Sequence, residues 1–173
     1  MDMRYFFAFI GMILISVSCE KIDPQYPDKP QIDYQGFALY ITTDALNNKT
    51  LIGQLSFDFT DGDGNIGLNP YTDTTNINLP DSLRYNFFLQ MYNLEGYAYV
   101  KVPAGEGGVL KYRIPYLDKK PLSGTMELEI SYPSIGDYDT IYYTFYIYDR
   151  DLNRSNVDTT QVIVLSGIDL EEI

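Results

Sequence analysis

Two short loops of this chain place acidic and amide side chains at alternate positions, a pattern typical of calcium ligands. The first loop carries Asp61, Asp63 and Asn65, and the second carries Asp149 and Asp151. Alternate spacing directs the side-chain oxygens to one side of a tight loop, and calcium is bound by about six to eight oxygens. The sequence therefore predicts that these five residues supply the oxygens of one calcium site.

An alternative interpretation of both loops needs no metal. Asp-Gly pairs favour turns, because glycine adopts positive φ and aspartate bonds its own backbone, and Arg150 and Arg154 could neutralise the carboxylates. The first loop resembles the start of an EF-hand loop, but it has Ile66 where that loop has glycine and Thr72 where it has glutamate. A calcium site and a pair of arginine-neutralised turns both remain open on the sequence.

The residue types that are missing exclude several kinds of catalytic site and leave carboxylate, Lys, Ser, Thr or Tyr chemistry. There is no histidine, so Ser-His-Asp hydrolases and histidine-bound metals are excluded. The one cysteine is Cys19, and no second cysteine is available for a disulfide. A hydrolase that uses a pair of carboxylates is the main remaining enzymatic alternative. We expect a protein that is not an enzyme.

The N-terminal segment has the layout of a secretory signal. Arg4 supplies a positive charge, residues 5–15 are almost all apolar, and small residues at 16–18 precede Cys19. A cysteine at this point resembles the lipobox of bacterial lipoproteins, whose new N-terminal cysteine is lipidated. The resemblance implies a signal peptide at residues 1–18 and a lipid anchor on Cys19; a plain secretory signal is the alternative.

Residues 19–31 are expected to tether the domain to the membrane. Pro24, Pro27 and Pro30 recur every third residue, which is the period of polyproline II. The formal net charge of −12 excludes a nucleic-acid partner and would also be repelled by anionic lipid. Membrane attachment must then come from the acyl chains. We expect a lipid-anchored protein of the cell envelope, in the outer membrane.

After residue 32 the pattern is one of short strands and turns. Apolar residues alternate with polar ones, as in Phe57, Phe59 and the Ile141–Ile147 run, and no helical period exceeds two turns. This pattern predicts an all-β, antiparallel, immunoglobulin-like sandwich of seven to eight strands over residues 32–173. The expected strands are 35–43, 50–60, 83–92, 96–102, 109–114, 125–132, 140–149 and 157–165.

The immunoglobulin-type order assigns these strands to two sheets. Strands 35–43, 50–60, 125–132 and 109–114 would form one sheet, and 83–92, 140–149 and 157–165 the other. Tyr143 and Phe145 have the spacing of the tyrosine corner and the core cysteine of those domains. Core packing of Phe57, Phe87, Tyr143, Phe145 and Ile147 is expected.

Two stretches of the chain resemble a known group of modules. Residues 57–64, Phe-Asp-Phe-Thr-Asp-Gly-Asp-Gly, resemble the Trp-Asp-Phe-Gly-Asp-Gly motif of PKD-type immunoglobulin-like domains. Residues 143–155 resemble the C-terminal hairpin of these and of HYR-type bacterial modules. The resemblance implies an immunoglobulin-like fold with an adhesion or spacer role, and no catalysis.

One sheet is expected to carry aromatic residues on its outer face. If Ile141 and Phe145 face the core, the alternating residues of two neighbouring strands face outward: Phe88, Tyr92, Tyr142, Tyr146 and Tyr148. Such a face could stack sugar rings or dock a protein. Loops 62–82 or 93–108 folding over the face would instead make it part of the interior.

These observations favour a membrane-anchored surface lipoprotein that acts as a non-catalytic binding or structural module. One alternative is a carbohydrate-binding module that uses the aromatic face. A carboxylate-dependent hydrolase is the other alternative. The partners expected are the membrane, through the lipid anchor, and a protein or glycan ligand.

Overall fold

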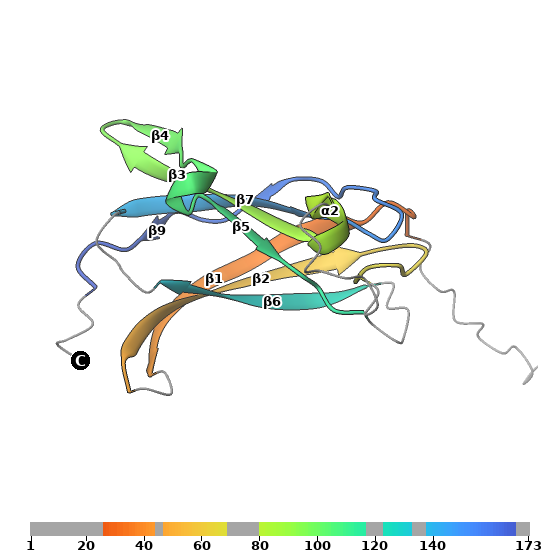
Figure 1. Cartoon of the computed structure of the whole chain (residues 1–173), viewed down its shortest axis with the longest axis horizontal. Coiled ribbons are helices and arrows are strands. Elements are labelled where there is room, and N and C mark those ends of the chain that lie inside the picture. The colour runs from red at the N-terminus through yellow and green to blue at the C-terminus, as the bar shows by residue number, and fades with distance from the viewer. Residues whose placement is uncertain (1–25, 44–46, 69–79, 117–122, 133–137, 169–173) are drawn as a thin grey trace, which may run out of the picture.

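The computed structural model of the chain describes residues 26–43, 47–68, 80–116, 123–132 and 138–168. These residues form two antiparallel β-sheets packed as two layers (Figure 1), which confirms the predicted all-β sandwich. The described strands are β1 (Gln31–Thr43), β2 (Lys49–Thr60), β3 (Phe87–Glu95), β4 (Ala98–Lys101), β5 (Val109–Tyr112), β6 (Ser123–Tyr132), β7 (Thr140–Ile147), β8 (Asp158–Thr159) and β9 (Ile163–Val164).

Each of the eight predicted segments contains a strand. The ninth strand of the described chain arises because the segment 157–165 forms two short strands, β8 and β9, separated by three residues. The segment 83–92 enters its strand only at Phe87, since a four-residue helix, α2 (Asp81–Arg84), precedes it. A second short helical turn, η1 (Ala104–Glu106), lies between β4 and β5.

The first sheet has the strand order β1-β2-β6, and the second has the order β4-β3-β7-β8. In the second sheet β5 also pairs with β3, and β9 also pairs with β7. The pairing of β1 with β2 has a single register shift, between Tyr34 and Gly36. Strand β7 lies at the centre of the second sheet, where each inward residue contacts the opposite layer.

The sheet assignment of residues 109–114 was wrong. We expected this strand beside 125–132, whereas β5 pairs with residues 87–90 of β3 in the other sheet. Asn86 holds it there: its backbone N–H donates to the Tyr112 carbonyl at 3.1 Å, and its side-chain Oδ1 accepts from the Ile114 N–H at 2.7 Å. The connection from β4 is also short, which favours a strand that stays in the same sheet.

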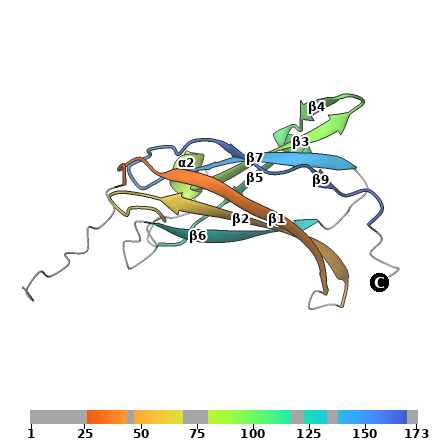
Figure 2. The same ribbon diagram turned by 180° about the vertical axis from the view of Figure 1, so that it is seen from behind.

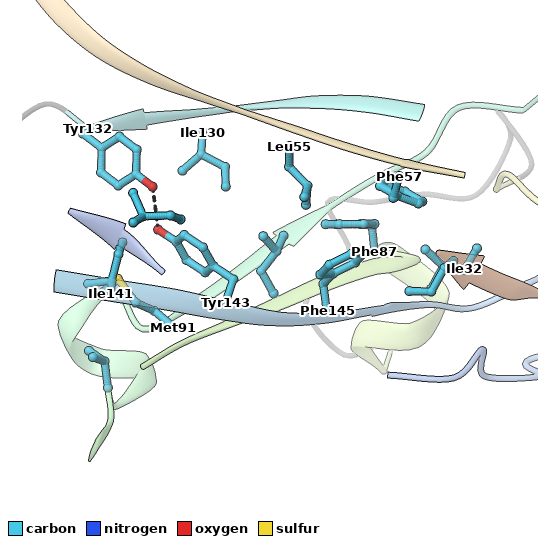
Figure 3. Packing of buried hydrophobic residues seen from close by; sticks show 14 of the residues in the cluster. Ile32, Leu55, Phe57, Phe87, Met91, Ile130, Tyr132, Ile141, Tyr143 and Phe145 are labelled. Carbon is cyan, nitrogen blue, oxygen red and sulfur yellow. Dashed lines mark hydrogen bonds between the residues drawn. The ribbon is translucent and has the colours of Figure 1, made fainter. Parts of the chain in front are cut away.

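The predicted core is confirmed. Phe57, Phe87, Tyr143, Phe145 and Ile147 are all buried in one cluster between the sheets (Figure 3). The centroids of the Phe57 and Phe87 rings lie 5.3 Å apart, and Phe145 lies 5.4 Å from the first and 6.0 Å from the second. These three rings join β2 of one sheet to β3 and β7 of the other.

Tyr143 does not form a tyrosine corner. Its hydroxyl instead lies 3.0 Å from the hydroxyl of Tyr132, on the strand β6 of the opposite sheet (Figure 3). Burial raises the pKa of Tyr132 to about 12 and raises that of Tyr143 as well. Both hydroxyls therefore stay protonated, and their hydrogen bond connects β6 to β7 across the core.

The tether and the β3–β4 hairpin lie at opposite ends of the sandwich. The N–H of Gly62, just after β2, donates to the carbonyl of Pro27 at 2.8 Å, so the chain enters beside the end of β2. Strand β3 begins at this end, where Phe87 pairs with Ile147, and runs away from it. Figures 1 and 2 show the β3–β4 hairpin projecting from the other end.

Candidate functional site

The first acidic loop is a tight turn built around Asp61. This side chain is fully buried, and its Oδ2 accepts the N–H of Asn65 at 2.7 Å and of Ile66 at 3.1 Å. Gly64 adopts a φ of 63° inside the turn, a conformation that suits glycine. The carboxylate of Asp61 thus fixes the path of the chain as it leaves β2.

The second acidic loop repeats this device after β7. Asp149 is fully buried, and its two oxygens accept the backbone N–H and the side-chain amide of Asn153, both at 2.8 Å. Leu152 takes a φ of 64° to close the turn. A buried carboxylate at the start of each loop therefore organises that loop.

The two loops meet, as the sandwich predicted. The side-chain amide of Asn65 donates to Asp63 Oδ2 at 2.7 Å and to Asp151 Oδ2 at 3.0 Å. Ile66 and Asp149 form an isolated antiparallel bridge between the loops. All five residues of the predicted cation site are therefore gathered at the end of the sandwich where the tether enters.

The arginines do not neutralise this cluster, in contrast to the alternative prediction. Arg150 Nη1 donates to the carbonyls of Ile66 and Gly67 at 3.3 and 3.1 Å, and its guanidinium lies over the Tyr116 ring. Arg154 lies over the ring of Tyr146. In the described chain, neither arginine forms an ion pair with any of the four carboxylates.

Several oxygens of the first loop are buried without a hydrogen-bond partner in the described chain: Oδ1 of Asp61, of Asp63 and of Asn65. Burial, together with the nearby charges of Asp63 and Asp149, raises the pKa of Asp61 from 3.8 to about 6 against the opposing effect of its two backbone hydrogen bonds. Buried acceptors of this kind are costly. The loop therefore presents carboxylate and amide oxygens that the protein itself does not satisfy.

The aromatic face forms as predicted on the outer side of β3 and β7. Phe88 pairs with Tyr146 across the two strands, and Tyr92 pairs with Tyr142. The ring centroids of the first pair are 5.3 Å apart with an interplanar angle of 12°, and those of the second are 4.8 Å apart at 3°. Tyr148 meets Phe88 and Tyr146 edge to face.

These ring contacts limit what the face can bind. The rings of Tyr92 and Tyr142 are nearly parallel with centroids 4.8 Å apart, so they stack and each covers part of one face of its partner. Phe88 is only 8% exposed, which removes it from the predicted binding face. Tyr99 of β4, a strand of the same sheet, meets Tyr142 edge to face, so the ring contacts of this face extend onto the β3–β4 hairpin. The four tyrosines of the face, Tyr92, Tyr142, Tyr146 and Tyr148, are half-buried.

The β3–β4 hairpin, which our predicted binding face did not include, carries four exposed aromatic and apolar residues close together. Tyr97 at its tip is fully exposed, and Leu94, Tyr99 and Val100 are exposed beside it. Gly96, with a φ of 62°, forms the turn that joins the paired residues Glu95 and Ala98. The sequence could have identified this surface, because residues 94–100 are mostly apolar around Gly96 and do not alternate with polar residues as in a half-buried strand.

The base of this hairpin is fixed by hydrogen bonds. The side-chain amide of Gln90 donates to the carbonyls of Met91, Val102 and Gly108 at 2.9–3.0 Å. A Cβ on Gly108 would lie 2.0 Å from the Val102 carbonyl oxygen, so this close approach requires glycine. The hairpin therefore projects from a rigid base.

A cavity of about 670 Å³ opens between the sheets near the edge strand β6. It is lined by the core rings of Phe57, Phe59 and Phe87 and by residues 112–116 and 123–128. Residues 117–122, which join these two stretches of the lining along the sequence, lie outside the described chain. We assign it no ligand.

The comparisons with known proteins give no relative to argue from. No family model matches the chain, and no curated protein or solved structure matches it either. Cys19 and the predicted signal peptide lie outside the described residues. In the portion that the structure describes, no helix is long and apolar enough to cross a membrane.

Proposed function

We propose that this protein is a lipid-anchored, non-catalytic docking module of the bacterial cell envelope that presents its β3–β4 hairpin to a protein partner. The observation that carries the proposal is the placement of the tether and the hairpin at opposite ends of the sandwich (Figures 1 and 2). With Cys19 held in lipid, the hairpin would face away from the membrane. This is the orientation that an anchored docking module needs.

The chemistry of the hairpin supports a protein partner. A contiguous exposed group of aromatic and apolar residues marks an interaction surface more often than it marks a free one. Tyrosine is enriched in protein-binding loops, because it supplies large contact area at low conformational cost. The net charge of −12 would steer a partner that carries basic residues around an apolar centre.

The acidic loops support the absence of catalysis. A carboxylate-dependent hydrolase needs two carboxyl groups that face each other across an accessible cleft. Asp61 and Asp149 are fully buried, and both organise turns through backbone hydrogen bonds. A polymeric substrate has no access to either group.

The glycan-binding alternative rests on the aromatic face alone. That face would have to bind sugars through the edges and outer faces of rings that already stack in pairs. Binding on a glycan array that is lost in Tyr142→Ala but kept in Tyr97→Ser would favour this alternative over docking by the hairpin.

The lipid anchor is tested by a Cys19→Ser variant. Each buried CH₂ of an acyl chain contributes about 0.8 kcal/mol to membrane binding, so a diacylated cysteine holds the protein firmly. We expect wild type in the membrane fraction with the mass of the lipidated, cleaved chain, and the variant in the soluble fraction. A variant that stays in the membrane fraction would contradict the anchor.

The docking surface is tested by Tyr97→Ser and Tyr99→Ser, with Tyr40→Ser as the matched control. Tyr40 on β1 is as exposed as Tyr99, at 38%, but it belongs to the other sheet. Truncating an interface tyrosine typically weakens binding about tenfold or more. The partner that co-purifies from the native envelope should fall accordingly in the hairpin variants and stay unchanged in the control. Equal losses in all three variants would refute the hairpin as the docking surface.

A further inference from the structure

We propose that the turns at 61–65 and 149–151 together bind one calcium ion, at the end of the sandwich where the tether enters. The proposal goes beyond the docking function and does not depend on it. It rests on three features of the cluster: the convergence of the two loops, the buried oxygens without partners, and the uncompensated charge.

The buried oxygens point to a cation more directly than the acidic residues themselves do. Asp61 is fully buried and Asn65 is 8% exposed, and each has an oxygen without a hydrogen-bond donor in the described chain. If Asp61 served only to shape the turn, its Oδ2 would accept the backbone N–H groups, as observed, and its Oδ1 would face water. Here Oδ1 is buried without a partner, in the turn that also carries Asp63 and that meets the second loop through the Ile66–Asp149 bridge.

The chemistry of these groups selects a hard cation. Carboxylate and amide oxygens are the side-chain ligands of calcium, and the chain offers no histidine to bind a softer metal. Asp61 Oδ1 and the carboxylate of Asp63 would supply one side of the site, and Asp151 would supply the other. Backbone carbonyls and water would complete the coordination, as in other calcium loops.

Asn65 explains why the carboxylates are not yet arranged around a common point. No three acidic side chains of the described chain stand together as a metal-binding group. The amide nitrogen of Asn65 lies between Asp63 Oδ2 and Asp151 Oδ2 and bonds to both. A calcium ion would replace this donor, with the amide turned so that its oxygen faces the ion.

Asp149 has a different role from the one predicted. Both of its oxygens already accept hydrogen bonds from Asn153, so it shapes the second turn and adds negative charge beside the ion. The first turn also holds the tether, since Gly62 lies between Asp61 and Asp63 and donates to the Pro27 carbonyl. Bound calcium would therefore stiffen the junction between tether and domain.

The test is the thermal unfolding of the mature full-length protein in millimolar calcium and in chelator. Binding to the folded state alone should raise Tm by roughly 5–10 °C at a hundredfold excess of calcium over Kd. Magnesium at the same concentration should raise Tm less, because it demands a small octahedral site. A potassium salt of equal ionic strength measures the contribution of charge screening.

Two variants should lose the calcium increment, Asp63→Asn and Asp151→Asn. Asp151 is exposed, so its variant retains the fold even if the first does not. Asp33→Asn, an exposed aspartate on β1, should keep the full increment. The proposal is overturned if calcium and potassium raise Tm equally, if magnesium matches calcium, or if both loop variants respond to calcium like wild type.

Discussion

Replacing Phe145 by alanine should lower the free energy of unfolding by about 3–5 kcal/mol, the range for large aromatic residues in a core. The ring is fully buried and contacts Phe57 and Phe87 from both sheets, with Tyr34 edge to face at 6.5 Å. Its removal leaves a cavity where the two layers meet. Urea unfolding followed by circular dichroism measures the change in the unfolding midpoint.

Val164→Ala provides the control for this prediction. Val164 lies on β9 with 55% of its surface exposed, so the same kind of truncation should cost no more than about 0.5 kcal/mol. If Phe145→Ala cost as little as Val164→Ala, the two sheets would not share the core described above.

Raising the pH should destabilise the metal-free protein through Asp61. Its pKa is raised by burial from 3.8 to about 6, so the folded chain holds this proton more tightly than the unfolded chain does. The stabilisation that comes from this tighter proton binding is therefore complete below about pH 4 and is lost as the pH rises through 6. A shift of about two units corresponds to about 3 kcal/mol.

The contribution of Asp61 is isolated by comparison with Asp61→Asn, which cannot titrate. The charged neighbours that act on Asp61 are Asp63 from its own loop and Asp149 from the loop after β7, and both are kept in the variant. The measurement is made in buffer freed of divalent cations. Between pH 4 and pH 7.5, the free energy of unfolding of wild type should fall by about 3 kcal/mol relative to that of Asp61→Asn. A difference that does not change with pH would show that Asp61 titrates alike in the folded and unfolded chains.

The sandwich and its core could be predicted because both follow from local alternation. Inward residues such as Tyr143, Phe145 and Ile147 recur at every second position, and that period fixes which face is buried. The convergence of the two acidic loops followed from the same prediction, since the loops after strands 50–60 and 140–149 lie at the same end of an immunoglobulin-type sandwich. These predictions did not require knowledge of any contact between residues that are distant in the sequence.

The features that could not be predicted depend on contacts between distant residues. The position of β5 is set by hydrogen bonds to Asn86. The alternation of strand 83–92 predicts that Asn86 faces solvent, whereas its side chain is fully buried. The burial of Phe88 depends on which ring stands opposite it on β7. The contact of Gly62 with Pro27 joins the tether to a loop more than thirty residues away, and neither segment has an alternating pattern that would predict the pairing.

The most direct test of the docking proposal is site-specific photo-crosslinking in the native envelope. A photoreactive phenylalanine analogue is placed at position 97, at the tip of the β3–β4 hairpin, and in a second protein at position 40 on the other sheet. The account predicts one discrete adduct of higher mass from position 97 and none from position 40. The absence of any adduct from position 97, or the same adducts from both positions, would contradict it.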